Sequence, residues 1–294
     1  MYDLNSSSLQ DEAFNGGPRG QTWRTSSYAS RFGLNKQNML KKDFEKDTNA
    51  NAAPDTREAR ILCKESAAEV GLEAARLVAS QLEQKPDASI VFPTGNTPLP
   101  MYAALREMSG LNWSRAQLFQ LDEYLPPNSG KPAQYESFAT FIHRELWGHV
   151  GGVKHYFQDF MQSPQAYERL VAQNQGPDLV ILGIGTNGHV AFNEPGSTPD
   201  SPTRVIELAD ETIRSNFGGI ERQNFPKQAI TLGLKAILSA KKIILLATGE
   251  SKIQILQKAF NPHTPPSINC PASWLKIHRN TLIITDFKVC FPVD

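Results

Sequence analysis

Short runs of hydrophobic residues recur along the chain, separated by stretches in which hydrophobic and polar positions repeat with a helical period. The continuous hydrophobic runs, each short enough to be a strand, lie at 88–93, 116–124, 178–185, 241–249 and 280–286. The amphipathic stretches that predict helices include 98–108, 136–147 and 250–260. Short apolar strands that alternate with helices are typical of a parallel sheet covered on both faces. The pattern predicts an α/β fold with a Rossmann-like open, mostly parallel sheet, helices on both faces and a single domain.

The N-terminal part of the chain does not follow this pattern. It is polar, rich in Ser, Asn and Gly, and lacks sustained periodicity, so we expect a disordered N-terminal extension over 1–55. Arginines interleaved with aromatic residues leave a tethering or targeting role open as an alternative. A strand at 57–63 and a helix at 65–84 then begin the domain, which we expect to cover 56–294.

Composition excludes several classes of partner. The chain has 30 Lys and Arg residues and 30 Asp and Glu residues, so a broad surface for nucleic acid or an anionic membrane is not expected. Cys63, Cys270 and Cys290 are far apart in the sequence, which favours reduced, mostly buried thiols over a disulfide or zinc framework. No hydrophobic run approaches the roughly 20 residues of a membrane helix, and the N-terminus lacks an apolar signal core. We therefore expect a cytoplasmic protein.

Polar or glycine-rich stretches follow four of the predicted strands. They lie at 93–98, 122–126, 185–196 and 248–252. In open parallel sheets, ligands bind beyond the carboxyl ends of the strands. We therefore expect these four stretches to converge on one site, and this convergence carries more weight than any single motif.

The first of these stretches, "PTGNTP", is a candidate anion site. Gly95 and Asn96 permit a tight turn, Thr97 suits a helix N-cap, and the hydroxyls of Thr94 and Thr97 are further donors. Backbone N–H groups at a helix N-terminus bind phosphate well, although an ordinary strand-to-helix turn explains the residues equally well. Lys252 follows another strand, in the first turn of a helix, where the helix dipole disfavours a cation unless an anion binds there. A solvated lysine is the alternative.

The second stretch, "LDEY", offers a candidate base. Asp122 and Glu123 stand where a hydrophobic run ends, and only one of the two can face a given pocket because adjacent strand residues point to opposite faces. A carboxylate in a half-buried position can act as a general base. The alternative is a turn that ends the strand, since Pro126 and Pro127 follow.

The third stretch contains a G-x-G-x-x-G pattern at Gly183, Gly185 and Gly188. A dinucleotide-binding loop needs a helix to begin inside the pattern, but Pro195 follows shortly and stops any helix. We therefore interpret the pattern as a loop that presents His189.

Around His189 the loop carries further polar residues. Glu194 can orient the imidazole and stabilise its charged form, and Asn187 and Asn193 lie beside them. A hydrogen-bonded structural histidine is the alternative, and it is the commoner role of a lone histidine.

Taken together, "PTGNTP", "LDEY", "GIGTNGHVAFNEPG", "ITLGLKAIL", "TGESK" and "CPASWLKIH" resemble, in order and spacing, the glucosamine-6-phosphate deaminase family. This family of amino-sugar-phosphate isomerases is related to the 6-phosphogluconolactonases, and the likeness runs from about 57 to 288. The resemblance implies conversion of an amino-sugar 6-phosphate into a ketose 6-phosphate and ammonia, without a metal or redox cofactor. It also implies roles for three residues. Asp122 would be the base of the enolisation, His189 would open the sugar ring, and Glu194 would be its partner.

The resemblance also implies that residues 94–97 and Lys252 hold the phosphate, and it exposes three departures from the family pattern. Asn187 stands where many members have Asp. Gly218 stands where well-known members have a phosphate-binding Arg, a role that Arg214 or Arg222 could take over. Ile206 stands where allosterically activated members have Lys, so we expect weak or absent activation by N-acetylglucosamine 6-phosphate.

The leading hypothesis is therefore a glucosamine-6-phosphate deaminase with a small-molecule sugar phosphate as its partner. A galactosamine-6-phosphate deaminase of the same family is an alternative, because the Asn187 loop and the segment at 214–228 also resemble that branch. The two sugars differ only in the orientation of one hydroxyl. A non-catalytic sugar-phosphate sensor is the alternative from a different class, motivated by Gly218 and the long extension. A lactonase and a dinucleotide-dependent enzyme are weaker readings. A homo-oligomer is left open.

Overall fold

The computed structural model describes residues 59–126, 135–151, 154–208, 212–213 and 225–291. Its centre is a parallel sheet of seven strands in the order β1-β10-β9-β6-β2-β3-β5. The strands are β1 (Arg60–Cys63), β2 (Ser89–Phe92), β3 (Gln117–Gln120), β5 (Lys154–His155), β6 (Leu179–Leu182), β9 (Ile243–Ala247) and β10 (Thr281–Thr285). The expected open parallel sheet is therefore confirmed. The predicted extension at 1–55 lies outside the described residues.

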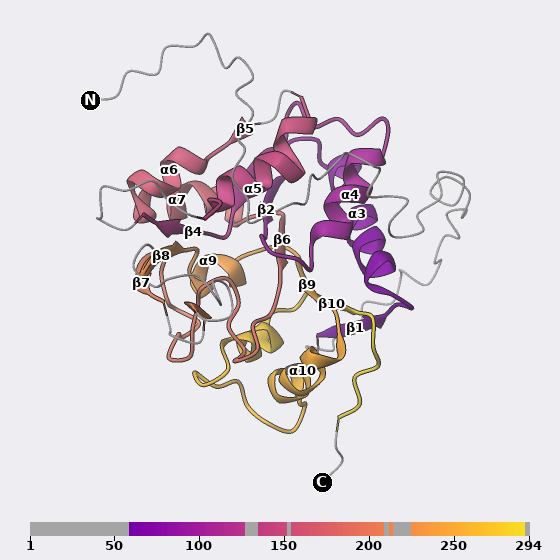
Figure 1. Cartoon of the computed structure of the whole chain (residues 1–294), viewed down its shortest axis with the longest axis vertical. Coiled ribbons are helices and arrows are strands. Elements are labelled where there is room, and N and C mark those ends of the chain that lie inside the picture. The colour runs from indigo at the N-terminus through magenta and orange to yellow at the C-terminus, as the bar shows by residue number, and fades with distance from the viewer. Residues whose placement is uncertain (1–58, 127–134, 152–153, 209–211, 214–224, 292–294) are drawn as a thin grey trace, which may run out of the picture.

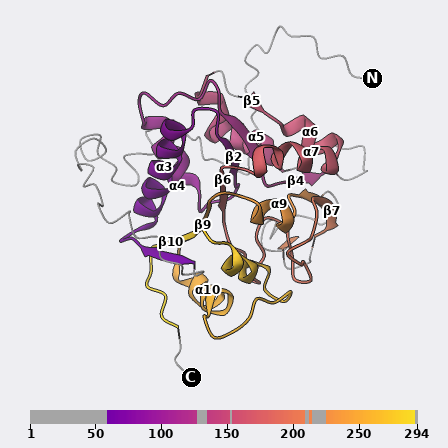
Figure 2. The ribbon, with the colours of Figure 1, turned by 180° about the vertical axis from the view of Figure 1, so that it is seen from behind.

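Helices cover both faces of this sheet. Since successive strand residues point to opposite sides, each strand contributes side chains to the buried clusters on both faces. Ile90 and Phe92 of β2 belong to one buried cluster, whereas Val91 belongs to the other. The first cluster is covered by α3 (Ala67–Gln84), α4 (Leu99–Glu107), α5 (Phe138–Glu145) and η1 (Trp147–His149). The second is covered by α6 (Phe157–Gln162), α7 (Pro164–Val171), α9 (Leu234–Leu238), α10 (Ile253–Phe260) and η5 (Pro271–Ile277). Figures 1 and 2 show α3 and α4 together on one side of the sheet and α9 and α10 on the other.

The helix α3 shows how the sequence fixes this packing. Its N-cap Ser66 accepts a hydrogen bond from the backbone N–H of Glu69, which satisfies a donor that the helix itself leaves unpaired. Val70, Ala74 and Val78 recur along one face and are fully buried; a valine side chain contributes about 2 kcal/mol on such burial. Gly71 faces α4 so closely that a Cβ atom would lie 2.4 Å from the Cβ of Pro100.

A second, antiparallel sheet in the order β4-β8-β7 was not predicted. It consists of β4 (Asp122–Leu125), β8 (Gln228–Thr231) and β7 (Arg204–Glu207). The single strand predicted at 116–124 is therefore wrong, since it breaks at Leu121 into β3 and β4. The carbonyl of Leu121 accepts a hydrogen bond from the N–H of Leu232, so the break directs the chain out of the large sheet and into the small one.

The order of the strands defines where a ligand would bind. From β2 the chain adds β3 and β5 on one side, then returns to the other side of β2 with β6, followed by β9 and β10. This reversal places a topological switch point between β2 and β6, and crevices for ligands form beyond the carboxyl ends of strands at such points. The four strands β9, β6, β2 and β3 are consecutive neighbours. These are the strands that the candidate site residues follow.

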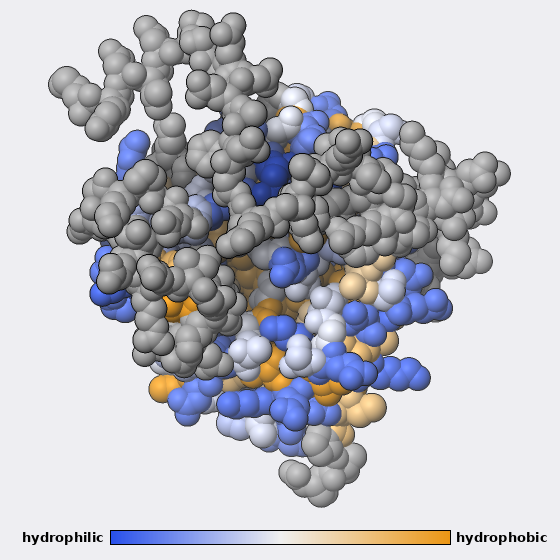
Figure 3. All heavy atoms as spheres, in the orientation of Figure 1, coloured by the Kyte–Doolittle hydropathy of each residue, from blue (hydrophilic) through white to orange (hydrophobic). Residues whose placement is uncertain are grey.

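Further observations concern the membrane segments, metal sites, cysteines and surface considered from the composition. In the part of the chain that the structure describes, no helix is long and apolar enough to cross a membrane, and no cluster of His, Cys, Asp and Glu is arranged to hold a metal ion. All three cysteines are free thiols, but the expectation that they are mostly buried is wrong: Cys270 is buried, whereas Cys63 and Cys290 are exposed. The described surface visible in Figure 3 intersperses hydrophilic and hydrophobic residues.

Candidate functional site

The turn after β2 provides uncommitted backbone donors. Gly95 has φ +95°, a conformation that favours glycine, and the carbonyl of Asn96 accepts a hydrogen bond from the N–H of Leu99. Among the described residues, the N–H groups of Gly95, Asn96 and Thr97 have no hydrogen-bond partner. The predicted N-cap at Thr97 is wrong by one residue: α4 begins at Leu99 after Pro98, and no side chain caps it. An uncapped helix start with free N–H groups suits an anion.

Lys252 places a cation beside this turn. Its Nζ atom donates a hydrogen bond to the carbonyl of Ile184 at 2.8 Å, and Ile184 lies just beyond the end of β6, the strand next to β2. Lys252 ends the short helix η4 (Glu250–Lys252), which continues into α10. Burial lowers the pKa of its ammonium group. The hydrogen bond to Ile184 therefore holds Lys252 near the carboxyl end of β6. Because a carbonyl is neutral, it does not compensate the positive charge of the ammonium group.

Asp122 and Glu123 have different environments, as expected from their opposite directions. Glu123 accepts hydrogen bonds from the backbone N–H groups of Tyr124, Phe138 and Ala139, all at 2.9 Å, and so caps the start of α5. The carboxylate of Asp122 is 6% exposed and makes no hydrogen bond within the described residues. Burial, followed by repulsion from Glu123, raises the pKa of Asp122 well above its usual value. Asp122 is the member of the pair that is available as a base.

The small sheet connects Asp122 to the loop that follows β6. Asp122 pairs with Thr231 across β4 and β8, and the Thr231 hydroxyl accepts a hydrogen bond from the N–H of Phe192 at 3.0 Å. The fully buried Asn193 donates to the carbonyls of Val190 and Leu232, which fixes the loop a second time. The loop is therefore held rigidly against the strand that carries Asp122.

Within this loop, His189 and Glu194 form a pair. Nδ1 of His189 lies 3.4 Å from Oε1 of Glu194. This nitrogen is buried and makes no hydrogen bond among the described residues. Asn187 supports both residues, because its Oδ1 accepts from the N–H of His189 and its Nδ2 donates to Oε2 of Glu194 at 2.7 Å. Thr212 donates to Oε1 of Glu194 at 2.6 Å.

These contacts determine the charge of Glu194. Burial alone would raise the pKa of its carboxyl, but the imidazole of His189 and the hydrogen bonds from Thr212 and Asn187 outweigh that effect and hold the pKa below its usual value. A charged carboxylate beside an imidazole can stabilise the imidazolium form and keep the ring oriented for proton transfer.

The glycines of the loop serve the histidine. A Cβ atom on Gly185 would lie 2.3 Å from Cε1 of His189, so only glycine leaves room for the imidazole. Gly188 has φ +87° and packs against the sulfur of Cys270. No helix begins anywhere in 183–203, all of which is described, so the segment is a loop, as expected, and lacks the helix start that a dinucleotide-binding loop needs.

The structure thus places the predicted residues at the carboxyl ends of neighbouring strands. In the order of neighbouring strands, Lys252 follows β9, His189 and Glu194 follow β6, the turn at 94–97 follows β2, and Asp122 follows β3. Thr212 and Thr231 were not predicted as site residues. Thr212 lies outside every quoted motif, and although Thr231 lies in "ITLGLKAIL", the sequence alone does not show what its hydroxyl contacts. Gly218, Arg214 and Arg222 lie outside the described residues.

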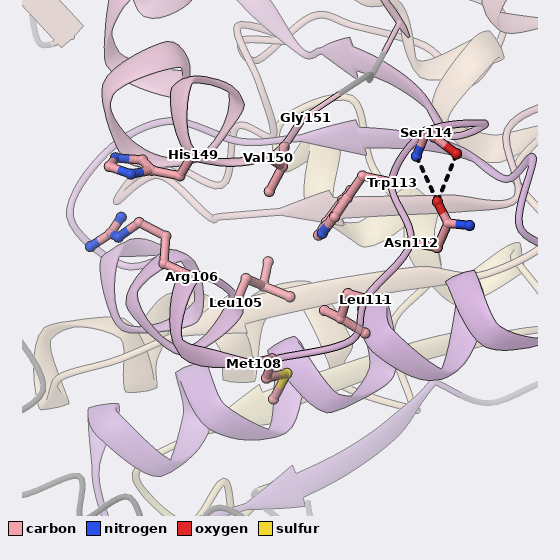
Figure 4. A pocket seen from close by; sticks show the side chains of 10 residues that line it. All are labelled: Leu105, Arg106, Met108, Leu111, Asn112, Trp113, Ser114, His149, Val150 and Gly151. Atoms are coloured by element: carbon pink, nitrogen blue, oxygen red, sulfur yellow. Dashed lines mark hydrogen bonds between the residues drawn. The ribbon is translucent and has the colours of Figure 1, made fainter.

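A cavity of about 250 Å³ lies elsewhere, near the amino-terminal ends of β3 and β5. Figure 4 shows the side chains that line it. It is bounded by the end of α4, the segment that leads into β3 and the segment after η1. Arg106, one of its polar residues, is already paired with Glu145 at 2.9 Å. Because ligands of open parallel sheets bind at the carboxyl ends of the strands, this cavity is not the candidate active site.

Comparison with known proteins identifies the family of the chain. Residues 63–284 match the family described as glucosamine-6-phosphate isomerases/6-phosphogluconolactonase. A glucosamine-6-phosphate deaminase of Clostridium botulinum is 35% identical over 238 residues, which cover 77% of this chain and 96% of that protein. The corresponding enzyme of Bacillus pumilus is 36% identical over 231 residues, covering 74% of this chain and 93% of that protein.

Solved structures give the same result at the level of the fold. The structure of a monomeric glucosamine-6-phosphate deaminase matches with a TM-score of 0.68 at 30% identity, covering 77% of this chain and 96% of that one. A 6-phosphogluconolactonase of Thermotoga maritima matches with a TM-score of 0.57 at 23% identity, covering 78% and 98%, which shows a shared fold. The chain belongs to the glucosamine-6-phosphate isomerase/6-phosphogluconolactonase family.

Proposed function

We propose that the protein is an amino-sugar-6-phosphate deaminase that converts glucosamine 6-phosphate and water into fructose 6-phosphate and ammonia. The observation that carries the proposal is the convergence of a buried, unpaired carboxylate, a histidine–carboxylate pair and an anion site on four neighbouring strand ends. The deaminases that are 35% and 36% identical over almost their whole length support the same reaction.

Asp122 is the proposed base of the enolisation. An aldose-to-ketose conversion moves a proton from C2 to C1, and one carboxylate can carry it between the two carbons. Burial raises the pKa of Asp122, which brings its basicity closer to that needed at neutral pH. The absence of a hydrogen-bond partner among the described residues leaves its oxygen atoms available to a substrate.

His189 is the proposed catalyst of ring opening. Opening the pyranose requires a proton to leave the C1 hydroxyl and another to reach the ring oxygen, and an imidazole can do both. Glu194 lies beside Nδ1 of the imidazole, and Asn187 accepts a hydrogen bond from the backbone N–H of His189. Asn187 also donates to Glu194 and so links the two contacts. Such proton transfer contributes typically about 10²–10⁴-fold to a rate.

The turn at 94–97 and Lys252 are the proposed phosphate site. The free N–H groups of Gly95, Asn96 and Thr97, the hydroxyl of Thr94 and the ammonium of Lys252 are all donors. An incoming phosphate would compete with the carbonyl of Ile184 for Lys252, and the opposite charge favours the phosphate. Asp122 and His189 would then act on the other end of the sugar.

Three readings remain to be distinguished by one experiment. Purified protein is given glucosamine 6-phosphate, galactosamine 6-phosphate and 6-phosphogluconolactone in parallel, and ammonia release, lactone hydrolysis and the melting temperature are measured. Turnover of one or both supports the deaminase and identifies the preferred sugar. Thermal stabilisation by both sugars without ammonia would instead favour the non-catalytic sensor. Hydrolysis of 6-phosphogluconolactone would favour the lactonase.

We also propose that the enzyme works in the cytoplasm. The three free thiols support this location, because disulfides are rare in reducing compartments. Sedimentation of the purified protein at several concentrations measures its oligomeric state directly.

A further inference from the structure

One oxygen atom of Glu194 contacts two groups at once. The hydroxyl of Thr212 donates to Oε1 of Glu194 at 2.6 Å, and the same oxygen lies 3.4 Å from Nδ1 of His189. The second carboxylate oxygen, Oε2, accepts from Asn187. Thr212 therefore makes the shorter of the two contacts with the oxygen that faces the imidazole.

The position of Thr212 makes this hydrogen bond a stable part of the site. Thr212 is 3% exposed, so little water competes with its hydroxyl for the carboxylate. It lies 18 residues after Glu194, beyond β7, and so joins a separate segment to the histidine loop. Hydrogen bonds from a neutral donor to a charged acceptor are stronger than those between neutral groups.

The other groups around Glu194 do not replace this contact. Asn187 is committed to Oε2, and His189 is the only titratable side chain that directly contacts the carboxylate among the described residues. The nearby guanidinium of Arg204 donates instead to Asn193, Ser197 and the carbonyl of Pro202. Thr212 is thus the hydroxyl that sets the position of Oε1.

We infer that Thr212 is a positioning residue for the proposed ring-opening step: its hydroxyl fixes the Glu194 carboxylate beside the imidazole of His189. The inference rests on the proposed function. A carboxylate free to rotate would not hold the imidazole in one orientation. With Oε1 fixed by Thr212, the imidazole stays oriented for proton transfer to and from the substrate.

The test compares Thr212→Val, which removes the hydroxyl at nearly constant volume, with Thr212→Ser, which keeps it. We expect Thr212→Val to lower kcat by about ten- to a hundredfold with little change in KM, as for the loss of a hydrogen bond to a charged group. Loss of the hydroxyl also removes one of the hydrogen bonds that lower the pKa of Glu194, so the acidic limb of the kcat/KM profile moves to higher pH. Thr212→Ser restores both.

Two results would overturn the inference. One is a pH profile of Thr212→Val that matches the wild type. The other is a Thr212→Ser variant as impaired as Thr212→Val, since the loss would then come from packing of the methyl group. If Thr212→Val does not fold, Thr212→Ala removes the same hydroxyl and takes its place. In a Glu194→Gln background, Thr212→Val should add little further loss, because the two residues act through one interaction.

A measurement without turnover separates this inference from the proposed function. The carboxyl carbon of Glu194 is followed by NMR during a pH titration of isotope-labelled wild-type protein and Thr212→Val, with Glu194→Gln to assign the signal. We expect the Glu194 midpoint to be higher in Thr212→Val. Equal midpoints would refute the Thr212 contact even in an active enzyme. A shifted midpoint in a protein that releases no ammonia would leave the contact standing and reject the deaminase instead.

Discussion

Asp122 and Thr231 lie opposite each other across β4 and β8, and the hydroxyl of Thr231 accepts a hydrogen bond from the backbone of Phe192. This contact joins the proposed base to the loop that carries His189. The base is thus positioned by the antiparallel sheet and the phosphate site by the parallel one. Their relative position depends on the break at Leu121, where the chain passes from one sheet to the other.

The first prediction concerns the two adjacent acids. Asp122→Asn should lower ammonia release by at least about a thousandfold, because an amide cannot accept the C2 proton. Glu123→Gln is the matched control. It should keep kcat within about tenfold but lower the free energy of unfolding by about 1–2 kcal/mol, because the cap of α5 loses an acceptor oxygen. Rates and urea unfolding are measured for both. Retained turnover in Asp122→Asn would remove Asp122 from the mechanism.

The second prediction follows from the raised pKa of Asp122. The charged form is disfavoured in the folded protein, so the ionisation of Asp122 costs stability as pH rises above about 3.9, the value of an unfolded aspartate. Asp122→Asn should therefore gain in melting temperature relative to the wild type as pH rises from 4 to about 7. A constant difference across that range would show that the carboxylate is not penalised by burial.

Asp178, which directly precedes β6, is a buried aspartate whose pKa shifts in the opposite direction to that of Asp122. Burial alone would raise its pKa, but Lys241 and Lys85, at 2.8 and 2.7 Å, outweigh this and lower it. Its contribution to stability is therefore present above about pH 3.9 and is lost as pH falls further, towards its folded-state pKa. Asp178→Asn should lower the free energy of unfolding by about 1–3 kcal/mol at pH 7, with the difference shrinking in acid. Denaturant unfolding at pH 7 and pH 3 measures it; an equal loss at both would contradict the assignment.

The third prediction tests the space for the imidazole. Gly185→Ala places a Cβ atom where the ring of His189 lies, so the ring must move and kcat should fall by about a hundredfold or more. Gly183→Ala is the control in the same loop, since nothing lies within 4 Å of its added Cβ. The ring signals of His189 in NMR spectra of the unliganded variants report the displacement. They should shift strongly in Gly185→Ala and little in Gly183→Ala.

The fourth prediction concerns Lys252. Lys252→Met should raise KM for the sugar phosphate about ten- to a hundredfold, because a charged donor to the phosphate is lost. It should also abolish competitive inhibition by inorganic phosphate. Lys258→Met removes the same charge from an exposed position of α10 and should change neither quantity. Equal effects of the two substitutions would point to the overall charge of the helix rather than to a phosphate contact.

The sequence predicted the parallel sheet better than it predicted the small sheet, for a physical reason. The strands β6 and β9 are buried on both faces and so read as continuous hydrophobic runs. In contrast, β7 alternates between half-buried and exposed residues, and β8 begins with an exposed glutamine, so neither forms such a run. Asp122 and His189 could be found because they stand next to strand ends. Thr212 could not, because only the folded chain brings it to Glu194.

The last prediction concerns regulation. Ile206 lies on β7 opposite Ala229 and packs against the apolar cluster that contains Tyr124 and Phe192. An aliphatic side chain in this position offers no charge to a phosphate group, whereas the activated members of the family have a lysine there. Rates plotted against glucosamine 6-phosphate should therefore be the same with and without N-acetylglucosamine 6-phosphate at concentrations below those that compete for the active site. A sigmoidal curve that this ligand makes hyperbolic would show that other residues supply the activator site.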